Sequence, residues 1–142
     1  MDTQLPEQKG FVWNEEYSVG VKEIDDQHKQ LFIYVNELME VIRETPDPER
    51  VRKITEQLIA YKISHFATEE KYFHEFNYAE TDAHEAAHRQ FDKRIKDLQA
   101  QFPDDVYSFA FGLVDFLEDW LIGHLMGTDK KYVKCFAEHG LH

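Results

Sequence analysis

The 142-residue chain is long enough for one domain with a buried core. Its 28 acidic and 16 basic side chains give a net charge of −12. This charge disfavours binding to nucleic acid and to anionic membranes, and it is compatible with binding divalent metal ions. The single cysteine, Cys135, cannot form an internal disulfide and fits a reducing compartment. The N-terminus has no signal-peptide pattern and the longest charge-free stretch near the C-terminus, residues 106–114, is too short to cross a bilayer, so we expect a cytoplasmic protein without membrane insertion.

The chain is predicted to contain an N-terminal arm, residues 1–20, and four long helices. In each of four segments, residues of the core register recur three or four positions apart, as one face of a helix requires. The four series are Ile24, His28, Leu31, Val35, Leu38 and Ile42; Val51, Ile54, Leu58, Tyr61, His65, Glu69 and Tyr72; His84, His88, Phe91, Ile95, Leu98 and Phe102; and Val106, Ala110, Leu113, Leu117, Trp120 and His124.

Prolines and capping residues indicate where these helices begin. Two prolines within residues 44–50 separate the first helix from the second. Thr81 or Asp82 is the expected N-cap of the third helix, and Pro103 is expected in the first turn of the fourth. A short fifth helix is expected after Gly127, with Thr128 as its N-cap.

No segment alternates with the period of two that a half-buried strand shows, so we expect no sheet. Helices of roughly 20 residues joined by short loops favour an antiparallel arrangement. We therefore predict an all-α fold in which residues 1–142 form one domain. Its architecture is an up-down-up-down antiparallel four-helix bundle with an N-terminal arm and a short C-terminal fifth helix.

Six polar residues occupy positions in these series where Leu or Val would be expected. A buried polar group is costly unless it is paired, and a single buried histidine is usually just hydrogen-bonded. Five histidines and a carboxylate, spread over four helices that pack together, would satisfy one another poorly. Metal ions would satisfy all the ring nitrogens at once, so we predict a metal site. The six residues are His28, His65, Glu69, His84, His88 and His124.

Two pairs of these residues have the spacing that places side chains on one helix face. His84 and His88 are four positions apart, and so are His65 and Glu69. Each pair can therefore bind one ion. The first and fourth helices supply one histidine each.

Asp129 lies five residues after His124. On a continuous α-helix this spacing turns the carboxylate about 140° away from the histidine. Asp129 can reach the same site only if the helix ends between them, and Gly127 is a residue suited to ending it. Alternatively, Asp129 is a first-turn acid that favours the positive end of the fifth helix. The two roles are compatible.

The stretch His84-Glu85-Ala86-Ala87-His88 matches the H-E-x-x-H pattern of zinc proteases. In that interpretation Glu85 is the catalytic base and His124 the third zinc ligand. It leaves the histidines of the first two helices unexplained and offers no strand to bind a peptide. Glu85 also points about 100° away from the ligand face, as a surface acid would. We therefore predict that the chain is not an enzyme.

Four segments together resemble the hemerythrin family, specifically the single-domain bacterial hemerythrins. They are WNEEYSVGVKEIDDQH (13–28), HFATEE (65–70), HEAAHRQF (84–91) and WLIGHLMGTD (120–129). The resemblance covers nearly the whole chain, and one small departure is Ala79, where relatives often have Pro. It implies a non-haem di-iron centre with an oxo or hydroxo bridge. It implies that one iron is bound by His84, His88 and His124, the other by His28 and His65, and that Glu69 and Asp129 bridge the two.

The resemblance also implies the function. With fewer histidines, the second iron has an open coordination position for dioxygen. We expect reversible oxygen binding for carriage, storage or delivery to an oxygen-using enzyme, by a monomer. The alternative is sensing of oxygen, nitric oxide or iron at the same site. Sensors are usually coupled to an output module, which we do not find here.

Several neighbours of the predicted ligands have two possible roles. Leu121 and Leu125 flank His124 and either line an oxygen pocket or only pack in the core. Asp25 either orients a ligand or caps the first helix. Trp13 and Trp120 are candidates for covering the centre.

Overall fold

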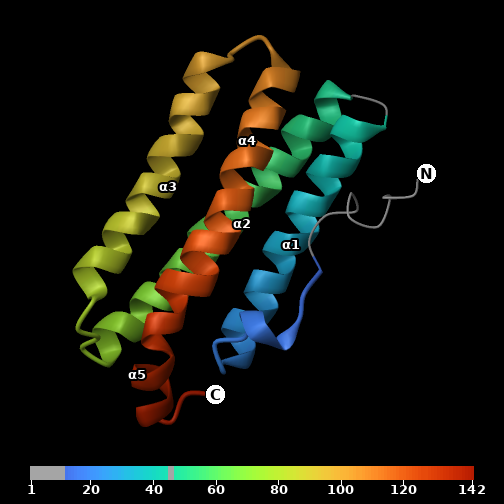
Figure 1. Ribbon diagram of the computed structural model, residues 1–142. Coiled ribbons are helices and arrows are strands. Elements are labelled where there is room, and N and C mark those ends of the chain that lie inside the picture. Colours follow the sequence, from blue (N-terminus) through green and yellow to red (C-terminus); the bar gives the residue numbers. More distant parts are fainter. Residues whose placement is uncertain (1–11, 45–46) are drawn as a thin grey trace.

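The computed structural model describes residues 12–44 and 47–142, and four long helices in them pack as an antiparallel bundle (Figure 1). No strand occurs within these two ranges. The all-α bundle predicted from the sequence is therefore confirmed. The helices are α1 (Lys22–Arg43), α2 (Pro48–Glu75), α3 (Thr81–Gln101) and α4 (Val106–Trp120). A π-helix (η3, Leu121–Thr128), a 3-10 turn (η4, Asp129–Tyr132) and α5 (Val133–Glu138) continue directly from α4, and a 3-10 turn (η2, Glu15–Tyr17) precedes α1.

The starts of α2 and α4 follow from carboxylate caps. Asp47 accepts hydrogen bonds from the first backbone N–H groups of α2, and Pro48 occupies a first-turn position where its missing N–H costs nothing. Asp105 caps α4 in the same way, so that helix begins at Val106. The prediction that Pro103 lies in the first turn of the fourth helix is wrong, because the aspartate cap starts the helix after the proline.

The two N-caps predicted from threonine or aspartate are also wrong. The third helix begins at Thr81 without a side-chain cap, and the Thr81 hydroxyl instead donates to the carbonyl oxygen of Tyr78 at 2.6 Å. Thr128 makes no capping hydrogen bond either, since it lies within a continuous helical run. Gly127 does not end the fourth helix.

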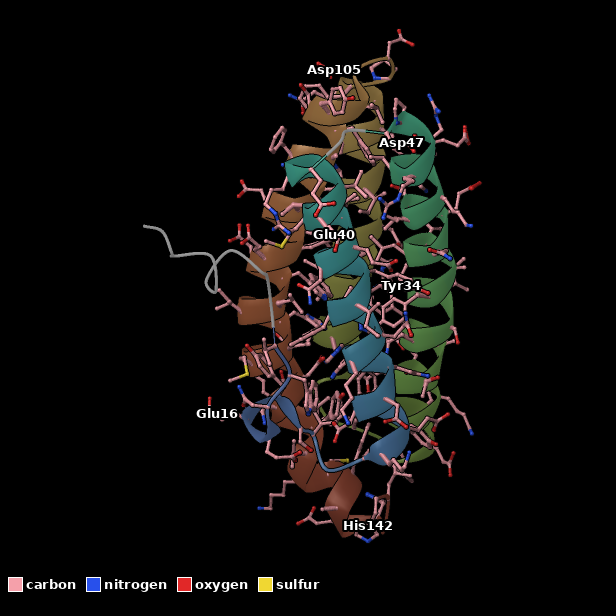
Figure 2. The ribbon with its side chains drawn as sticks, turned by 90° about the vertical axis from the view of Figure 1, so that its right-hand side faces the viewer. Glu16, Tyr34, Glu40, Asp47, Asp105 and His142 are labelled. Atoms are coloured by element: carbon pink, nitrogen blue, oxygen red, sulfur yellow. The ribbon has the colours of Figure 1, made fainter. Side chains whose placement is uncertain are left out.

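The bundle is held together by two apolar clusters. The larger one runs between the four long helices, with Val35, Ala110 and Leu113 fully buried. The smaller one lies at the end of the bundle where α5 packs, and includes Phe73 and Phe136. Figure 2 shows this end beside His142, opposite the end marked by Asp47 and Asp105.

Hydrogen bonds hold the residues before α1 against the end of the bundle that carries α5. The carboxylate of Asp25 accepts from the hydroxyl of Ser18 at 2.6 Å and from the backbone N–H of Val19 at 2.9 Å. The ammonium group of Lys130 donates to the carbonyl oxygen of Ser18 at 2.6 Å. The prediction that Asp25 caps the first helix is wrong, because α1 has no side-chain cap, and the Asp25 carboxylate instead binds the segment that leads into α1.

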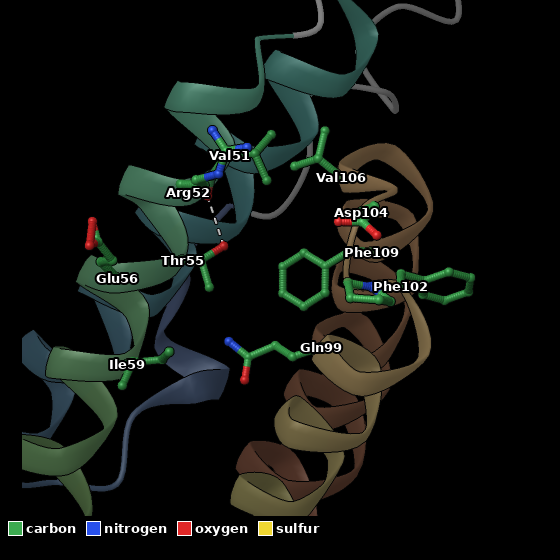
Figure 3. Close-up of a pocket in the computed structure, with 11 residues that line it drawn as sticks. Val51, Arg52, Thr55, Glu56, Ile59, Gln99, Phe102, Asp104, Val106 and Phe109 are labelled. Atoms are coloured by element: carbon green, nitrogen blue, oxygen red, sulfur yellow. Dashed lines mark hydrogen bonds between the residues drawn. The ribbon is translucent and has the colours of Figure 1, made fainter.

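A pocket of about 390 Å³ opens at the other end of the bundle, between α2 and the segment that joins α3 to α4 (Figure 3). Its walls include Val51, Ile59, Phe102 and Phe109, and Thr55 turns its hydroxyl away to the carbonyl oxygen of Val51. None of the predicted metal ligands lines this pocket. In the part of the chain that the structure describes, no helix has the length and apolar character needed to cross a membrane.

Candidate metal centre

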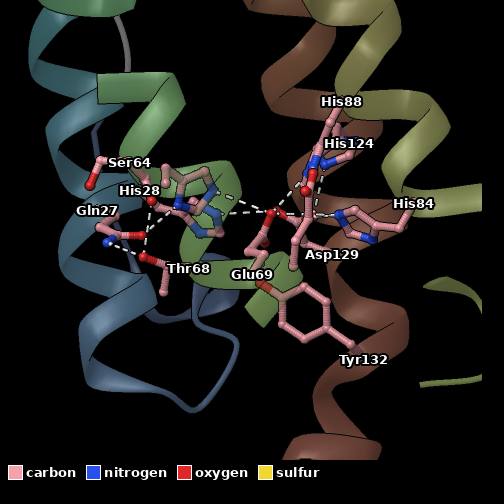
Figure 4. Close-up of polar contacts among 12 residues, drawn as sticks. Gln27, His28, Ser64, Thr68, Glu69, His84, His88, His124, Asp129 and Tyr132 are labelled. Carbon is pink, nitrogen blue, oxygen red and sulfur yellow. Dashed lines mark hydrogen bonds and ion pairs between the residues drawn. The ribbon is translucent and has the colours of Figure 1, made fainter. Parts of the chain in front are cut away.

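The structure brings all seven predicted ligands into one buried cluster (Figure 4). Each of the four long helical segments contributes to it, and no member is more than 6 % exposed. The periodicity of the sequence explains this convergence, because every helix turns its polar residues to the same side as its core residues. The seven residues are His28, His65, Glu69, His84, His88, His124 and Asp129.

The ligand-type atoms fall into two groups, each with its members within 4.8 Å of one another. The first group joins three histidines, His84, His88 and His124, to the carboxylate of Glu69. Oε1 of Glu69 lies 3.0 Å from Nε2 of His88 and 3.6 Å from Nε2 of His84. This group has the composition of a three-histidine metal position.

The second group joins two histidines, His28 and His65, to the carboxylates of Glu69 and Asp129. Oε1 of Glu69, which also faces the first group, lies 3.5 Å from Nε2 of His65. Oδ2 of Asp129 lies 3.1 Å from Nε2 of His28. The two groups therefore share Glu69, and the second has one histidine fewer and Asp129 in addition.

Asp129 reaches both groups from the end of a π-helix. Its Oδ1 lies 2.9 Å from Nε2 of His124 and 3.1 Å from Nε2 of His84, while Oδ2 faces His28. The helix does not end at Gly127 to allow this, as the sequence led us to expect. Residues 121–128 instead adopt π-helical hydrogen bonding, in which residues five apart share a face. The expected route to the site is wrong, although Asp129 does lie in the cluster.

The cluster has the polar chemistry of a metal site. Oxygens of Asp129 lie 2.9–3.1 Å from Nε2 of His28, His84 and His124, yet these contacts do not have the geometry of hydrogen bonds. Within the described residues, these nitrogens and both oxygens of Asp129 are buried without a hydrogen-bond partner. Unpaired buried polar atoms are costly, and atoms that converge on a common point are satisfied by a cation. The residues present therefore fit a bound metal ion.

The carboxylates of the cluster stay ionised. Burial by itself would raise the pKa of Asp129, but the charge and contacts of His124, together with His28 and His84, hold it well below its ordinary value. Burial and the neighbouring Asp129 would likewise raise the pKa of Glu69, and the surrounding histidines outweigh them and hold it well below its ordinary value. Negative charge is thus available at the centre of the bundle at neutral pH.

Two histidines respond to this charge in opposite directions. Burial would lower the pKa of His84, but its contacts with Asp129 and Glu69 and their charges raise it to about 9. For His65 the burial effect wins over the attraction of Glu69, and the pKa falls to about 4. His65 is therefore a neutral imidazole at pH 7, whereas His84 carries a proton that a metal ion would displace.

Three polar residues that sequence reasoning missed contact the predicted ligands. The hydroxyl of Tyr132 donates to Oε2 of Glu69 at 2.6 Å. Oε1 of Gln27 lies 2.6 Å from Nδ1 of His65, and Oε2 of Glu70 lies 2.9 Å from Nδ1 of His88. Their sequence signals are weak, because Gln27 directly precedes His28 and Glu70 directly follows Glu69, where an off-face position is expected.

Aromatic rings flank the histidines of the first group. Phe66 stacks on His88 with centroids 3.8 Å apart, and Trp120 stacks on His124 at the same separation. Trp120 therefore flanks the cluster as its sequence position suggested. Trp13 packs instead against Phe32, with ring centroids 5.7 Å apart, and none of its ring contacts within the described residues is with a predicted ligand.

Two leucines and one glutamate that lie close to the predicted ligands in the sequence have different surroundings in the structure. Leu121 and Leu125 are each 1 % exposed and belong to the larger apolar cluster, on the π-helix that carries His124. Glu85 lies away from the metal ligands and pairs at 2.6 Å with His74. The H-E-x-x-H stretch thus supplies two cluster histidines without placing its glutamate beside them.

Comparisons with known proteins match this chain over most of its length. The family model described as the hemerythrin HHE cation binding domain matches residues 19–136. The bacteriohemerythrin of Methylococcus capsulatus (strain Bath) is 32 % identical over 122 residues, which cover 86 % of this chain and 92 % of the relative. That of Pseudomonas aeruginosa (strain PAO1) is 30 % identical over 125 residues, covering 87 % and 79 %. A crystal structure of a hemerythrin variant with one leucine replaced by alanine has a TM-score of 0.77 and 30 % identity, and covers 88 % of this chain and 95 % of that one.

Proposed function

Because the chain belongs to the hemerythrin family, we propose that its buried cluster holds two iron ions and binds dioxygen reversibly, for oxygen carriage, storage or delivery to an oxygen-using enzyme. The observation that carries the proposal is the unequal division of the histidines between two adjoining ligand groups. Imidazole and carboxylate ligands suit iron. A pair of ferrous ions, when bound, supplies the two electrons that hold dioxygen and are recovered when it leaves.

The seven residues provide different ligand sets for the two metal positions. His84, His88 and His124, with Glu69, would hold one ion, and His28 and His65, with Glu69 and Asp129, would hold the other. Asp129 also faces His84 and His124, so it could serve both ions. The ion with fewer histidines would have the position at which a small molecule binds. Asp129 and Glu69 each face histidines of both groups, as bridging ligands must.

Apolar residues around the cluster exclude water. Leu121 and Leu125 lie on the same π-helix as His124, and Trp120 covers the ring of that histidine. A dry pocket slows the proton-assisted loss of oxygen in reduced form, which would leave the iron oxidised. We assign both leucines to the pocket lining in addition to their packing in the core.

The ligand set favours carriage over oxygen activation. Di-iron bundles that activate oxygen use about four carboxylates and two histidines. Here five histidines accompany two carboxylates, and Glu85 is paired with His74 and belongs to neither ligand group. No further carboxylate among the described residues joins the two ligand groups. We therefore propose a binding protein and not an enzyme.

The proposal is tested by metal analysis of the purified protein together with anaerobic optical titration with oxygen. We expect two irons per chain and a coloured adduct that disappears when oxygen is removed. Iron that oxidises as soon as oxygen is admitted would contradict carriage and would support sensing or detoxification at the same site. A single zinc per chain would contradict the di-iron centre and support the protease interpretation.

A further inference from the structure

Gln27 links the helix α1 to a histidine of α2 (Figure 4). Its side-chain oxygen Oε1 lies 2.6 Å from Nδ1 of His65, and its nitrogen Nε2 donates to Oγ1 of Thr68 at 3.1 Å. The hydroxyl of Thr68 in turn donates to the carbonyl oxygen of Ser64 at 3.0 Å. These contacts form a continuous chain of hydrogen bonds from the α2 backbone to the imidazole.

The direction of this chain follows from the single hydrogen of the Thr68 hydroxyl. Because that hydrogen is donated to Ser64, Oγ1 can only accept from Gln27, so the amide nitrogen faces Thr68. The amide oxygen then faces His65, and an oxygen acceptor requires the proton of the neutral ring on Nδ1. The other ring nitrogen, Nε2, is left with its lone pair toward the cluster, 3.5 Å from Oε1 of Glu69.

We infer that Gln27 is a positioning residue that fixes the tautomer and orientation of His65, so that Nε2 is ready to bind the ion at the two-histidine position. This inference rests on the proposed function and deepens it, because that position is the one assigned to oxygen binding. Gln27 itself touches neither the ion nor oxygen. Its effect passes through His65.

The three-histidine position is supported by a different chemical group. Nδ1 of His88 faces the carboxylate of Glu70 at 2.9 Å, where His65 faces an amide. A carboxylate draws the Nδ1 proton more strongly than an amide and makes the imidazole a stronger electron donor to its metal. The amide of Gln27 therefore keeps His65 the weaker donor and favours the ferrous state at the oxygen-binding position.

The tautomer is measured on the full chain loaded with Zn²⁺, which is diamagnetic, by proton-nitrogen correlation spectra of the histidine rings. We expect His65 to carry its proton on Nδ1 and to bind zinc through Nε2. Replacing Gln27→Leu should broaden or shift the Nδ1 proton signal and weaken zinc binding at one of two positions by about 10- to 100-fold. Thr68→Val, which removes the acceptor for the amide together with the hydrogen bond to Ser64 but leaves Gln27 in place, should act in the same direction with a smaller loss.

The matched control is Gln57→Leu at an exposed position on the same α2 helix, which should leave the spectra and the zinc affinity unchanged. Binding of zinc through Nδ1 of His65 in the wild type would overturn the inference. So would unchanged zinc affinity in both Gln27→Leu and Thr68→Val. Neither result depends on oxygen, so a failure here is distinct from a failure to form the oxygen adduct.

A reciprocal pair of variants tests the electronic role in the iron-loaded protein. Gln27→Glu should lower the midpoint potential of the iron centre and speed its oxidation in air, because a carboxylate then faces His65. Glu70→Gln should not reproduce this acceleration, because its histidine belongs to the other position. Equal oxidation rates for wild type and Gln27→Glu would overturn the assignment of Gln27 to redox tuning.

Discussion

The backbone N–H of Asp129 donates to the carbonyl oxygen of His124, five residues earlier in the chain. A π-helical hydrogen bond spans one residue more than an α-helical one, and this wider turn brings the Asp129 carboxylate to the side of the helix that carries His124. Oδ1 of Asp129 therefore lies 2.9 Å from Nε2 of that histidine. In an α-helix the two side chains would point about 140° apart. The local winding of the helix therefore supplies a bridging carboxylate without interrupting the chain.

The π-helix predicts the outcome of exchanging two neighbouring residues. The double variant Thr128→Asp with Asp129→Thr moves the carboxylate back by one residue, so that it projects from a different side of the π-helix than the oxygens of Asp129, which face His28, His84 and His124. We expect the purified variant to bind fewer than two metal ions per chain by metal analysis. Thr128→Ala is the control and should keep both. Full occupancy in the exchanged variant would mean that the π-helical winding is not required.

Tyr132 predicts a stability effect that separates a hydrogen bond from packing. Its hydroxyl donates to the buried Oε2 of Glu69, so Tyr132→Phe should destabilise the metal-free chain by about 1–3 kcal/mol, measured by chemical denaturation. The control is Tyr78→Phe, since the buried hydroxyl of Tyr78 has no partner among the described residues. Losing that hydroxyl should cost nothing. Equal losses in the two variants would show that the hydrogen bond to Glu69 adds no stability of its own.

The bundle and its seven converging residues could be predicted because both depend on local periodicity. A helix repeats every 3.6 residues, so a histidine in the apolar register must face the core with its apolar neighbours. At two helix ends the buried residues differ from those predicted. Val41 is buried in place of the predicted Ile42, and Phe73 in place of Tyr72. The two differences go in opposite directions, one residue earlier in α1 and one residue later in α2.

The surroundings of the ligands could not be predicted, because they depend on which helices are neighbours. A residue next to a ligand points about 100° away from it, which looks like a surface position on an isolated helix. In the bundle that direction faces the adjacent helix, so Gln27 reaches His65 and Glu70 reaches His88. The π-helix could not be predicted either, because the five-residue spacing between His124 and Asp129 does not by itself distinguish π-helical from α-helical winding.

The charge on His84 predicts how metal affinity depends on pH. The pKa of this histidine is about 9 in the metal-free chain, since Asp129 and Glu69 outweigh the effect of burial. Metal binding must displace its proton, so the apparent zinc affinity should rise about tenfold per pH unit between pH 7 and 9 and then level off. Competition with a coloured chelator measures this slope. His74→Ala, at an exposed histidine, should leave it unchanged.

The raised pKa of His84 also determines how the free energy of unfolding depends on pH. Because the folded chain binds this proton more tightly than the unfolded chain, protonated His84 stabilises the fold fully below pH 6.5, and the stabilisation is lost as the pH rises toward 9. The metal-free chain should therefore become less stable over that interval, as measured by denaturation at each pH. A zinc affinity and a stability that are both constant from pH 7 to 9 would contradict a charged His84.

Leu121 predicts a loss of oxygen protection beyond a loss of packing. It lies three residues before His124, whereas Leu117 lies a turn further away, and both are buried in the same apolar cluster. Truncation of either to alanine should cost about 2–5 kcal/mol of unfolding free energy, because each leaves a cavity. Only Leu121→Ala should open the surroundings of the iron to water. The iron-loaded Leu121→Ala protein should therefore oxidise in air faster than Leu117→Ala, followed by the decay of the oxygen-adduct absorbance. Similar decay in the two variants would show that general loosening of the core, and not a specific pocket wall, controls the lifetime of the adduct.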